Sequence, residues 1–359
     1  MSSIILQSAI TICFVAGKSG GHLLPCVTKA QQIKNEFPTA QLYIFSTGSD
    51  LDKKIIDKHT WLHHYIPAHL WDVPYQQLWL LPLFACNVAW YFCKSIYKLW
   101  KIKPQKIVSF GGFNSVPVCL AAKLLQIPFE LYELNQEPGK ATTFLSHFTK
   151  TIYVCFKETK KYFPQHSCIT FDYPVRFLPQ AKQYNKKDLL AKYNFTPDKK
   201  TVLILGGSQG STLLNQIVKE CIESYPALKQ QIQIIHQTGD QDFSNYAHFY
   251  QQYHIPALVF GYHEGLQDFY NLADIIICRA GAGTLFEIKF FQKPCICIPH
   301  ETANTNHQIK NVMALQKELP DQFTIVKQSD FNKNSLYRQF EKTILNSVDF
   351  TTKATQTCI

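Results

Sequence analysis

Short apolar runs recur along the chain at intervals that fit a parallel sheet, and helical segments follow several of them. The runs contain apolar and β-branched residues and predict buried strands at 10–16, 41–45, 106–110, 128–134, 151–156, 201–205, 232–236, 258–260, 275–278 and 294–299. Continuous apolar strands that alternate with helices are typical of parallel sheets covered on both faces. We therefore expect an α/β fold.

One junction between a predicted strand and a helix has the composition of a ligand site. The strand at 275–278 leads into the small residues at 280–283 and then into a helix. Small residues let a backbone approach a ligand closely, and the start of a helix presents N–H groups to an anion. Glu287 lies one turn further on, where its carboxylate suits a vicinal diol such as a ribose. The stretch predicts a nucleotide diphosphate site, and an ordinary strand-to-helix turn is the alternative.

Each half of the chain opens with a strand, a glycine-rich loop and a helix. The loops lie at 17–22 and 206–211, and this order predicts a Rossmann-like start in both halves. The chain has no G-x-G-x-x-G loop followed by an acidic residue about 20 positions later, which disfavours an NAD-linked oxidoreductase. His22 closes the first loop. Its reference pKa near neutrality suits a base or a hydrogen-bond donor, and a helix-capping or surface histidine is the alternative.

Other polar groups lie where predicted strands end, which is the ligand-binding edge of a parallel sheet. Glu133 and Asn135 end one strand and point the same way by the period of two. Two glycines end another at 111–112, and a polar loop at 300–308 suits the hydroxyls of a sugar. Arg176 falls in an irregular segment that is typical of an interdomain linker, where a guanidinium suits a phosphate. An ordinary salt bridge is the alternative for this arginine.

Composition narrows the class of protein. A length of 359 residues predicts about two domains. The net charge of +10 favours an anionic partner, such as nucleic acid, a phosphorylated ligand or an anionic membrane. The 12 cysteines include no C-x-x-C pair, and Cys295 and Cys297 are expected to be buried in a reducing compartment. The first nine residues lack a basic segment, so the apolar run that follows is expected to be a core strand and not a signal peptide.

The region from 73 to 129 contains no Asp or Glu. Its aromatic-rich run is shorter than the ~20 apolar residues that span a bilayer. A helix here places aromatic residues on one face with lysines beside them. Such a face fits the headgroup plane of an anionic membrane, and a helix packed on the sheet with a solvated basic edge is the alternative. The residues expected to contact the membrane are Trp79, Trp90, Lys94, Tyr97, Lys98, Trp100 and Lys101.

Seven motifs occur in order between residues 16 and 311. They are Gly17-Lys18-Ser19-Gly20-Gly21-His22, Phe110-Gly111-Gly112-Phe113, Glu133-Leu134-Asn135, Pro174-Val175-Arg176, Gly206-Gly207-Ser208-Gln209-Gly210, Cys278-Arg279-Ala280-Gly281-Ala282 and His307-Gln308-Ile309-Lys310-Asn311. Together and in this order they resemble the MurG family. The resemblance implies a GT-B fold, in which two Rossmann-like domains face one another across a cleft. Its implied domains are an acceptor- and membrane-binding domain at 1–172, a UDP-sugar-binding domain at 173–335, and a tail at 336–359 that packs back on the first domain.

The resemblance also implies an activity. It is the transfer of N-acetylglucosamine from UDP-N-acetylglucosamine (UDP-GlcNAc) to undecaprenyl-diphosphate-MurNAc-pentapeptide (lipid I), which gives lipid II in peptidoglycan synthesis. The implied enzyme requires no cofactor and no metal, is peripheral to the cytoplasmic face of the anionic cell membrane, and has no nucleic-acid partner. The alternatives are a related lipid glycosyltransferase with a different acceptor and a catalytically weak, membrane-docked scaffold.

The resemblance also implies which residues form the site, because each matches a motif position of the family. An inverting displacement needs a base for the acceptor hydroxyl, for which His22 is the first candidate and Glu133 the second. The residues implied to bind UDP-GlcNAc are Ser19, Gly20, Gly21, Asn135, Arg176, Ser208, His263 through its backbone, Ala282, Gly283, Thr284, Leu285, Phe286, Glu287 and Gln308. The chain departs from the family pattern at Lys18, at Tyr132 and Leu134 beside Glu133, and at His263.

Overall fold

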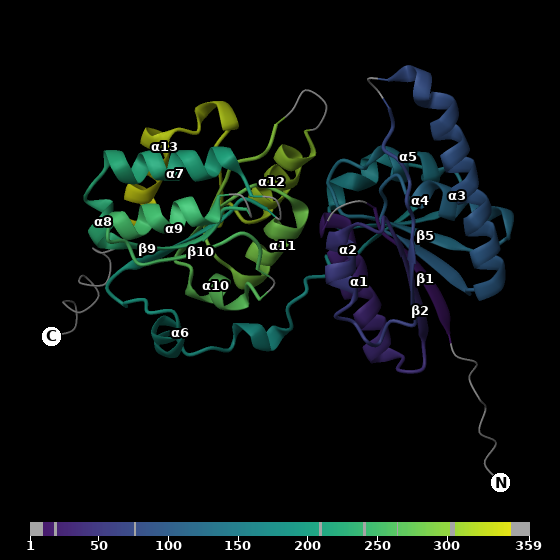
Figure 1. Cartoon of the computed structure of the whole chain (residues 1–359), viewed down its shortest axis with the longest axis horizontal. Helices are drawn as coiled ribbons and strands as arrows, with labels where there is room; N and C mark the ends of the chain where they lie inside the picture. The colour runs from purple at the N-terminus through teal and green to yellow at the C-terminus, as the bar shows by residue number, and fades with distance from the viewer. Residues whose placement is uncertain are drawn as a thin grey trace, which may run out of the picture. The chain divides into compact units, whose positions relative to one another are not determined.

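The computed structural model describes residues 10–17, 20–74, 77–207, 210–239, 242–263, 265–301 and 306–345. It divides into two compact units, Met1–Arg176 and Phe177–Ile359. Each unit has its own parallel sheet and its own helices (Figure 1). The division lies four residues beyond the boundary at 172 and 173 that the family resemblance implied.

The first unit is built on a seven-stranded parallel sheet in the order β3-β2-β1-β4-β5-β6-β7. The strands are β1 Thr11–Val15, β2 Gln41–Ser46, β3 His64–Pro67, β4 Lys106–Ser109, β5 Phe129–Glu133, β6 Thr151–Val154 and β7 Ser167–Thr170. The helices are α1 Gly20–Glu36, α2 Asp50–Ile56, α3 Leu81–Ile102, α4 Ser115–Leu124 and α5 Lys140–Ser146, with short helical turns η1 Leu78–Leu80 and η2 Lys157–Tyr162. Helices α1 and α2 pack together, and α3 and α5 both pack against α4 (Figure 1).

The second unit repeats this plan with six parallel strands in the order β10-β9-β8-β11-β12-β13. The strands are β8 Lys200–Leu205, β9 Ile232–Gln237, β10 Ala257–Phe260, β11 Ile275–Cys278, β12 Cys295–Cys297 and β13 Phe323–Ile325. The helices are α6 Lys186–Lys192, α7 Thr212–Ser224, α8 Leu228–Gln231, α9 Phe243–Gln252, α10 Gln267–Leu272, α11 Ala282–Phe291, α12 His307–Glu318 and α13 Lys333–Phe340, with the turns η3 Pro179–Lys182, η4 Gln328–Asp330 and η5 Glu341–Leu345.

Both strand orders are those of a Rossmann-like sheet. The order reverses between β1 and β4 in the first unit and between β8 and β11 in the second. At such a reversal the loops after the two central strands diverge and leave a crevice for a ligand. The loops that meet at these two points begin at Ala16, Phe110, Gly206 and Arg279, which places the predicted glycine loops at the switch points.

The expected strands are present, and three more strands lie at or near the edges. Strands β3, β7 and β13 were not predicted from the sequence. Strand β7 is mostly exposed, and β13 has only three residues, so neither has the continuous apolar run that marks a buried strand. Edge strands need one apolar face at most, which weakens the sequence signal.

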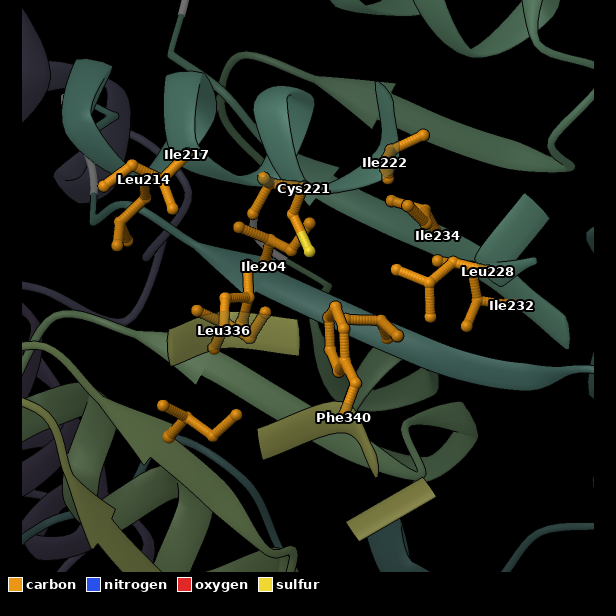
Figure 2. Close-up of a cluster of buried hydrophobic side chains, with 14 of the residues drawn as sticks. Ile204, Leu214, Ile217, Cys221, Ile222, Leu228, Ile232, Ile234, Leu336 and Phe340 are labelled. Atoms are coloured by element: carbon orange, nitrogen blue, oxygen red, sulfur yellow. The ribbon is translucent and has the colours of Figure 1, made fainter. Parts of the chain in front are cut away.

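Helix α13, which includes the first residues of the expected tail, packs in the core of the second unit. Leu336 and Phe340 are buried in the same core as Ile204 of β8 and Cys221 of α7. Figure 2 shows these side chains gathered between helix and strand. The apolar spacing of α13 therefore fills the core of its own unit. Residues 346–359 of the expected tail lie outside the described part of the chain.

Candidate functional site

The first glycine loop touches the loop after β4. A Cβ atom on Gly17 would lie 2.7 Å from the Cα of Gly112, and a Cβ on Gly112 would collide with the Cα of Gly17. Gly111 and Gly112 have φ of 77° and 82°, a region that glycine adopts without strain. The two loops therefore pack backbone to backbone, which only glycine allows, and they hold the start of α1 beside the end of β4.

His22 is fixed by this arrangement. It lies in the first turn of α1, and its Nδ1 is 2.7 Å from the backbone oxygen of Phe110. A carbonyl oxygen only accepts hydrogen bonds, so Nδ1 carries the proton in this contact. In the neutral imidazole the lone pair then lies on Nε2, the atom available to accept a proton from a substrate. The half-buried ring has the orientation and tautomer of a potential general base.

Glu133, the second candidate base, is hydrogen-bonded through both of its carboxylate oxygens. Its side chain is 4% exposed. One carboxylate oxygen accepts from the backbone N–H of Asn135 at 3.0 Å, and the other accepts from the backbone N–H of Gly139 at 3.1 Å. Both oxygens are thus committed to the loop after β5, which argues against proton abstraction from a substrate. The side-chain amide of Asn135 also donates to Glu133, at 3.4 Å, so the carboxylate orients this predicted sugar contact.

The loop after β8 is tightly folded against the loop after β9. Gly207 and Gly210 have φ of 89° and 77°. A Cβ on Gly210 would collide with the backbone oxygen of Thr238, and one on Gly206 would lie 2.5 Å from the amide nitrogen of Ser211. The glycines let the chain reverse direction immediately before α7. The backbone here lies at the switch point of the second sheet.

Helix α11 begins at Ala282, with Gly281 as its N-cap. This is the helix that the small residues predicted. Glu287 lies one turn into it, and its Oε2 accepts a 2.8 Å hydrogen bond from the hydroxyl of Tyr270. Tyr270 is fully buried on α10, so it fixes the carboxylate from beneath. Nothing in the sequence around Tyr270 marked this contact, because α10 and α11 meet only in the folded unit.

Two predicted donor contacts on α11 are limited to the backbone. The side chains of Leu285 and Phe286 are 0% and 9% exposed and pack inside the second unit. Ala282, Gly283 and Thr284 precede them in the first turn and are partly exposed. The N-terminal N–H groups of α11 are therefore the part of this turn that suits an anion.

Gln308 joins two strand ends. Its Oε1 accepts from the backbone N–H of Ala280 at 3.2 Å and from that of His300 at 2.8 Å. This leaves the amide Nε2, a donor, as the group suited to a sugar oxygen. The side chain lies in the first turn of α12, so the loops after β11 and β12 are held together at the edge of the sheet.

His263 is exposed in the loop after β10. Its ring lies 5.5 Å from that of Phe260 and 4.9 Å from that of Phe269, measured between centroids. The three rings form an aromatic cluster at the same edge of the sheet as the glycine loop. An aromatic surface of this kind suits a flat base.

The remaining predicted site residues are placed as follows. Gly20 is buried and Gly21 is exposed at the start of α1. Arg176 is half-buried and is the last residue of the first unit. Ser19 and Ser208 lie outside the described residues.

Helix α3 carries the predicted aromatic face on its exposed side. Trp90, Tyr97 and Trp100 are 71%, 57% and 63% exposed, and Trp79 on η1 is 73% exposed. Tyr91, Ser95 and Leu99 occupy the opposite face and are buried against the unit. Lys94 and Lys98 are half-buried, and Lys101 is exposed. The helix itself and its exposed aromatic face, expected from the spacing, are present.

The described residues contain no helix that is both long and apolar enough to cross a membrane. They also contain no group of three or more His, Cys, Asp or Glu side chains arranged to hold a metal ion. Cys295 and Cys297 are buried as expected, and the sulfur of Cys297 lies 3.7 Å from that of Cys278 on the neighbouring strand.

Comparisons with known proteins fit this geometry. Residues 12–154 match the glycosyltransferase family 28 N-terminal domain, and residues 201–358 match the glycosyltransferase family 28 C-terminal domain. A protein of Synechocystis is 30% identical over 311 residues, which cover 85% of this chain and 81% of the relative. A protein of Protochlamydia amoebophila is 30% identical over 312 residues, which cover 82% and 77%. Both are named UDP-N-acetylglucosamine–N-acetylmuramyl-(pentapeptide) pyrophosphoryl-undecaprenol N-acetylglucosamine transferase.

The chain belongs to this family of glycosyltransferases. Its fold also matches the crystal structure of Acinetobacter baumannii MurG, with a TM-score of 0.68 and 22% identity over 93% of this chain and 91% of that one. The predicted family and the GT-B class, with its two Rossmann-like sheets, are therefore confirmed.

Proposed function

We propose that this protein transfers N-acetylglucosamine from UDP-GlcNAc to lipid I and so forms lipid II. The observation that carries the proposal is the pairing of a diol-binding carboxylate with a helix start in the second unit of a chain of this family. Glu287 is held by Tyr270 one turn beyond the N-terminus of α11, which suits the ribose and diphosphate of one nucleotide. The fixed tautomer of His22 in the first unit supplies the other half of the reaction.

The donor is held by the second unit in this proposal. The N–H groups at the start of α11 and Ser208 bind the diphosphate, together with Arg176. Glu287 accepts hydrogen bonds from the ribose hydroxyls, and the backbone near His263 meets the uracil. The amide of Gln308 donates to the sugar, with Asn135 from the first unit as a further sugar contact. These roles require no metal, because backbone dipoles and a guanidinium stabilise the charge that develops on the departing UDP.

The reaction is a single inverting displacement. Nε2 of His22 accepts the proton of the acceptor hydroxyl as its oxygen attacks the anomeric carbon of the donor. The bond from that carbon to the diphosphate breaks, and UDP leaves with the bonding electrons. Gly20 and Gly21 present backbone beside His22 for a phosphate group, and Ser19 is assigned the same ligand by the family resemblance. A general base in this position supplies about 10²–10⁴-fold in rate.

We further propose that α3 attaches the protein to the cytoplasmic face of an anionic membrane. Three exposed aromatic side chains follow the helical repeat of α3, Trp79 on η1 adds a fourth, and lysines border the three on the helix. The charge supports this orientation, because residues 1–176 contain 18 Lys and Arg against 10 Asp and Glu, whereas the rest of the chain contains 18 against 16. A lipid-linked acceptor has to be reached at a membrane surface, and a soluble nucleotide sugar has to be reached from water.

A transfer assay tests the proposed activity. The protein is incubated with radiolabelled UDP-GlcNAc and a lipid I analogue, and a diacylglycerol acceptor competes in a parallel reaction. We expect label in the lipid I analogue alone. Label in the diacylglycerol acceptor would show that lipid I is not the specific acceptor. Binding of UDP-GlcNAc without transfer to either lipid would contradict the proposed activity and favour a membrane-docked scaffold.

A variant of the donor site sharpens this test. Glu287→Ala should raise the KM for UDP-GlcNAc about tenfold or more and leave the acceptor KM within about threefold, because the lost carboxylate would bind only the ribose. Tyr270→Phe keeps the carboxylate but removes its 2.8 Å hydrogen bond, and should give a smaller rise. A larger effect on the acceptor KM would overturn the assignment.

A further inference from the structure

We propose that Arg279 is a positioning residue of the donor site, whose guanidinium fork holds three loops of the second unit in one arrangement. This inference rests on the proposed function, because Arg279 joins the turn before α11 to the loops after β8 and β12, which hold or lead to residues assigned to UDP-GlcNAc. Arg279 follows β11 directly and precedes the turn that starts α11. The residue itself is assigned no contact with the donor.

The guanidinium contacts three separate segments. Its Nε donates to the hydroxyl of Ser211 at 3.1 Å, at the end of the second glycine loop. Its Nη1 donates to the backbone oxygen of Ile298 at 3.2 Å, just after β12, and to the side-chain oxygen of Gln328 at 2.9 Å, on the turn after β13. The backbone N–H of Arg279 also lies 3.3 Å from the oxygen of Leu205, the last residue of β8. One residue therefore joins the ends of four of the six strands.

The hydroxyl of Ser211 bonds to Arg279 in place of the usual N-cap hydrogen bond. It occupies the N-cap position of α7, where a serine hydroxyl usually accepts from a backbone N–H of the first turn. Its side chain makes no capping hydrogen bond, and its oxygen accepts from Arg279 instead. The second glycine loop is thus held from its far end by the strand that leads into α11.

The charge of Arg279 is not balanced within the described residues. All three acceptors are neutral, and no carboxylate of the described residues lies within ion-pair distance of this guanidinium. Burial lowers the pKa of the half-buried guanidinium from its ordinary value, although an arginine stays protonated at any physiological pH. A desolvated cation without an anion destabilises the free protein. An anionic ligand at this edge of the sheet relieves that cost, which is the situation expected beside a diphosphate.

The choice of arginine is itself informative. Of the 36 cationic residues in the chain, 33 are lysine, and the three arginines are Arg176, Arg279 and Arg338. A lysine ammonium is a point charge on a flexible stem, whereas the guanidinium is a rigid fork with donors in several fixed directions. Acceptors on three segments require the fork. If only a positive charge were needed at this position, a lysine, which is by far the more common cationic residue in this chain, would supply it.

The test compares two variants. Arg279→Lys keeps the positive charge but loses the guanidinium fork, and Arg279→Ala loses both the charge and the fork. The readouts are the KM for UDP-GlcNAc, the acceptor KM, kcat, and the Kd for UDP from calorimetry. We expect both variants to raise the donor KM and the UDP Kd about tenfold or more, with the acceptor KM changed less than about threefold. Millimolar guanidinium should restore much of the UDP affinity of Arg279→Ala, and methylammonium should not.

Several outcomes overturn the proposal. They are a wild-type donor KM in Arg279→Lys, equal changes in the two KM values, or no recovery with guanidinium. If Arg279→Ala does not fold, Ser211→Ala and Gln328→Leu each remove one acceptor and should raise the UDP Kd by a smaller factor. Arg338→Lys, at an exposed position on α13, should change neither KM. UDP binding needs no acceptor, so it tests Arg279 even if the wild-type protein transfers nothing to lipid I.

Discussion

The two candidate bases, His22 and Glu133, differ in whether the folded chain leaves one polar side-chain atom available for a substrate. His22, in the first turn of α1, and Glu133, at the end of β5, both lie in segments that follow or end strands of the first sheet, and both were predicted as candidate bases. His22 uses one ring nitrogen to anchor itself and keeps the other available. Glu133 uses both of its oxygens on backbone amides. The same position in a sheet therefore gives one residue suited to proton transfer and one that builds a loop.

Replacing His22 tests the assignment of the base. His22→Ala should lower kcat about 10²–10⁴-fold and leave the KM for UDP-GlcNAc nearly unchanged, because the base acts on the acceptor hydroxyl. Steady-state kinetics with UDP-GlcNAc and the lipid I analogue measures both constants. A variant with unchanged turnover would show that the proton goes elsewhere.

Glu133→Gln should behave as a structural variant. An amide offers one oxygen to two backbone N–H donors and turns an NH₂ group toward the other. Leaving a buried donor unpaired costs about 1–3 kcal/mol, so the free energy of unfolding should fall by that amount. Chemical denaturation measures it, with Glu36→Gln at an exposed position on α1 as the control. A stable variant that loses its turnover would restore Glu133 as a candidate base.

At the scale of elements, the loops and one helix carry the function. The glycine loops are packed backbone against backbone, which fixes their shape before any ligand arrives. Helix α3 has the opposite character, because its apolar side chains point away from its own unit. The loops are expected to tolerate no added atoms, and the outer face of α3 is expected to tolerate substitution without loss of the fold.

Gly210→Ala tests the packing of the second glycine loop. The glycine has φ of 77°, and a Cβ would collide with the backbone oxygen of Thr238. The variant should lose UDP affinity by about tenfold or more, since the loop has to shift to relieve the clash. Calorimetry with UDP measures this. Gly139→Ala is the control, because nothing lies within 4 Å of a Cβ there and its φ is −66°.

The outer face of α3 is tested by vesicle binding. The double variant Trp90→Ala and Trp100→Ala should reduce retention by vesicles that contain anionic lipid and leave the melting temperature unchanged. Replacing Lys94, Lys98 and Lys101 with Gln should weaken binding by about 1 kcal/mol per lysine at low salt. Phe243→Ala removes an exposed aromatic of the second unit and serves as the control. Wild-type binding that is equal for neutral and anionic vesicles would contradict the electrostatic part of the proposal.

At the scale of the whole molecule, the two units share one sheet topology, and the second unit buries a polar network in its core. Both sheets have the Rossmann-like strand order, and each places its glycine loop at the switch point. This network lies next to the loop after β9, which contacts the second glycine loop. His236 on β9 lies 2.9 Å from the hydroxyl of Tyr250 and 3.1 Å from Oδ1 of Asn215 on α7. The amide of Asn215 donates to the backbone of Thr238, so the network supports the loop that contacts Gly210.

His236 predicts a pH dependence of stability. Burial lowers the pKa of this fully buried imidazole from 6.5 to about 3. Between these values the unfolded chain binds a proton that the folded unit does not, so stability is lost as the pH falls below about 6.5. The slope from this residue is about 1.4 kcal/mol per pH unit. Urea unfolding of the wild type and of His236→Gln between pH 7 and pH 5 should show that slope in the wild type alone.

The control for this experiment is His248→Gln, an exposed histidine on α9. It should retain the pH dependence of the wild type. Equal slopes in the wild type and in His236→Gln would show that His236 takes up a proton in the folded unit as it does in the unfolded chain, which its complete burial opposes.

The sequence alone determined the strands that form the middle of each sheet, the two glycine loops and the helix at Ala282. It also determined the exposed aromatic face of α3. These features depend on neighbouring residues, since local periodicity sets which face is apolar and glycine sets where the backbone turns. The order of the motifs was enough to identify the family.

Only the tertiary structure decided which side chains meet. Tyr270 reaches Glu287, Arg279 reaches Ser211, and Leu336 fills the core beneath α7. The last two of these contacts join segments that are more than 60 residues apart in the sequence, and all three depend on strand order and on the packing of helices against the sheet. A short edge strand such as β13 likewise became visible only through its pairing with β12. Local periodicity carries no information about such partners, because the hydrogen bonds and packing that define them form only when the sheets assemble.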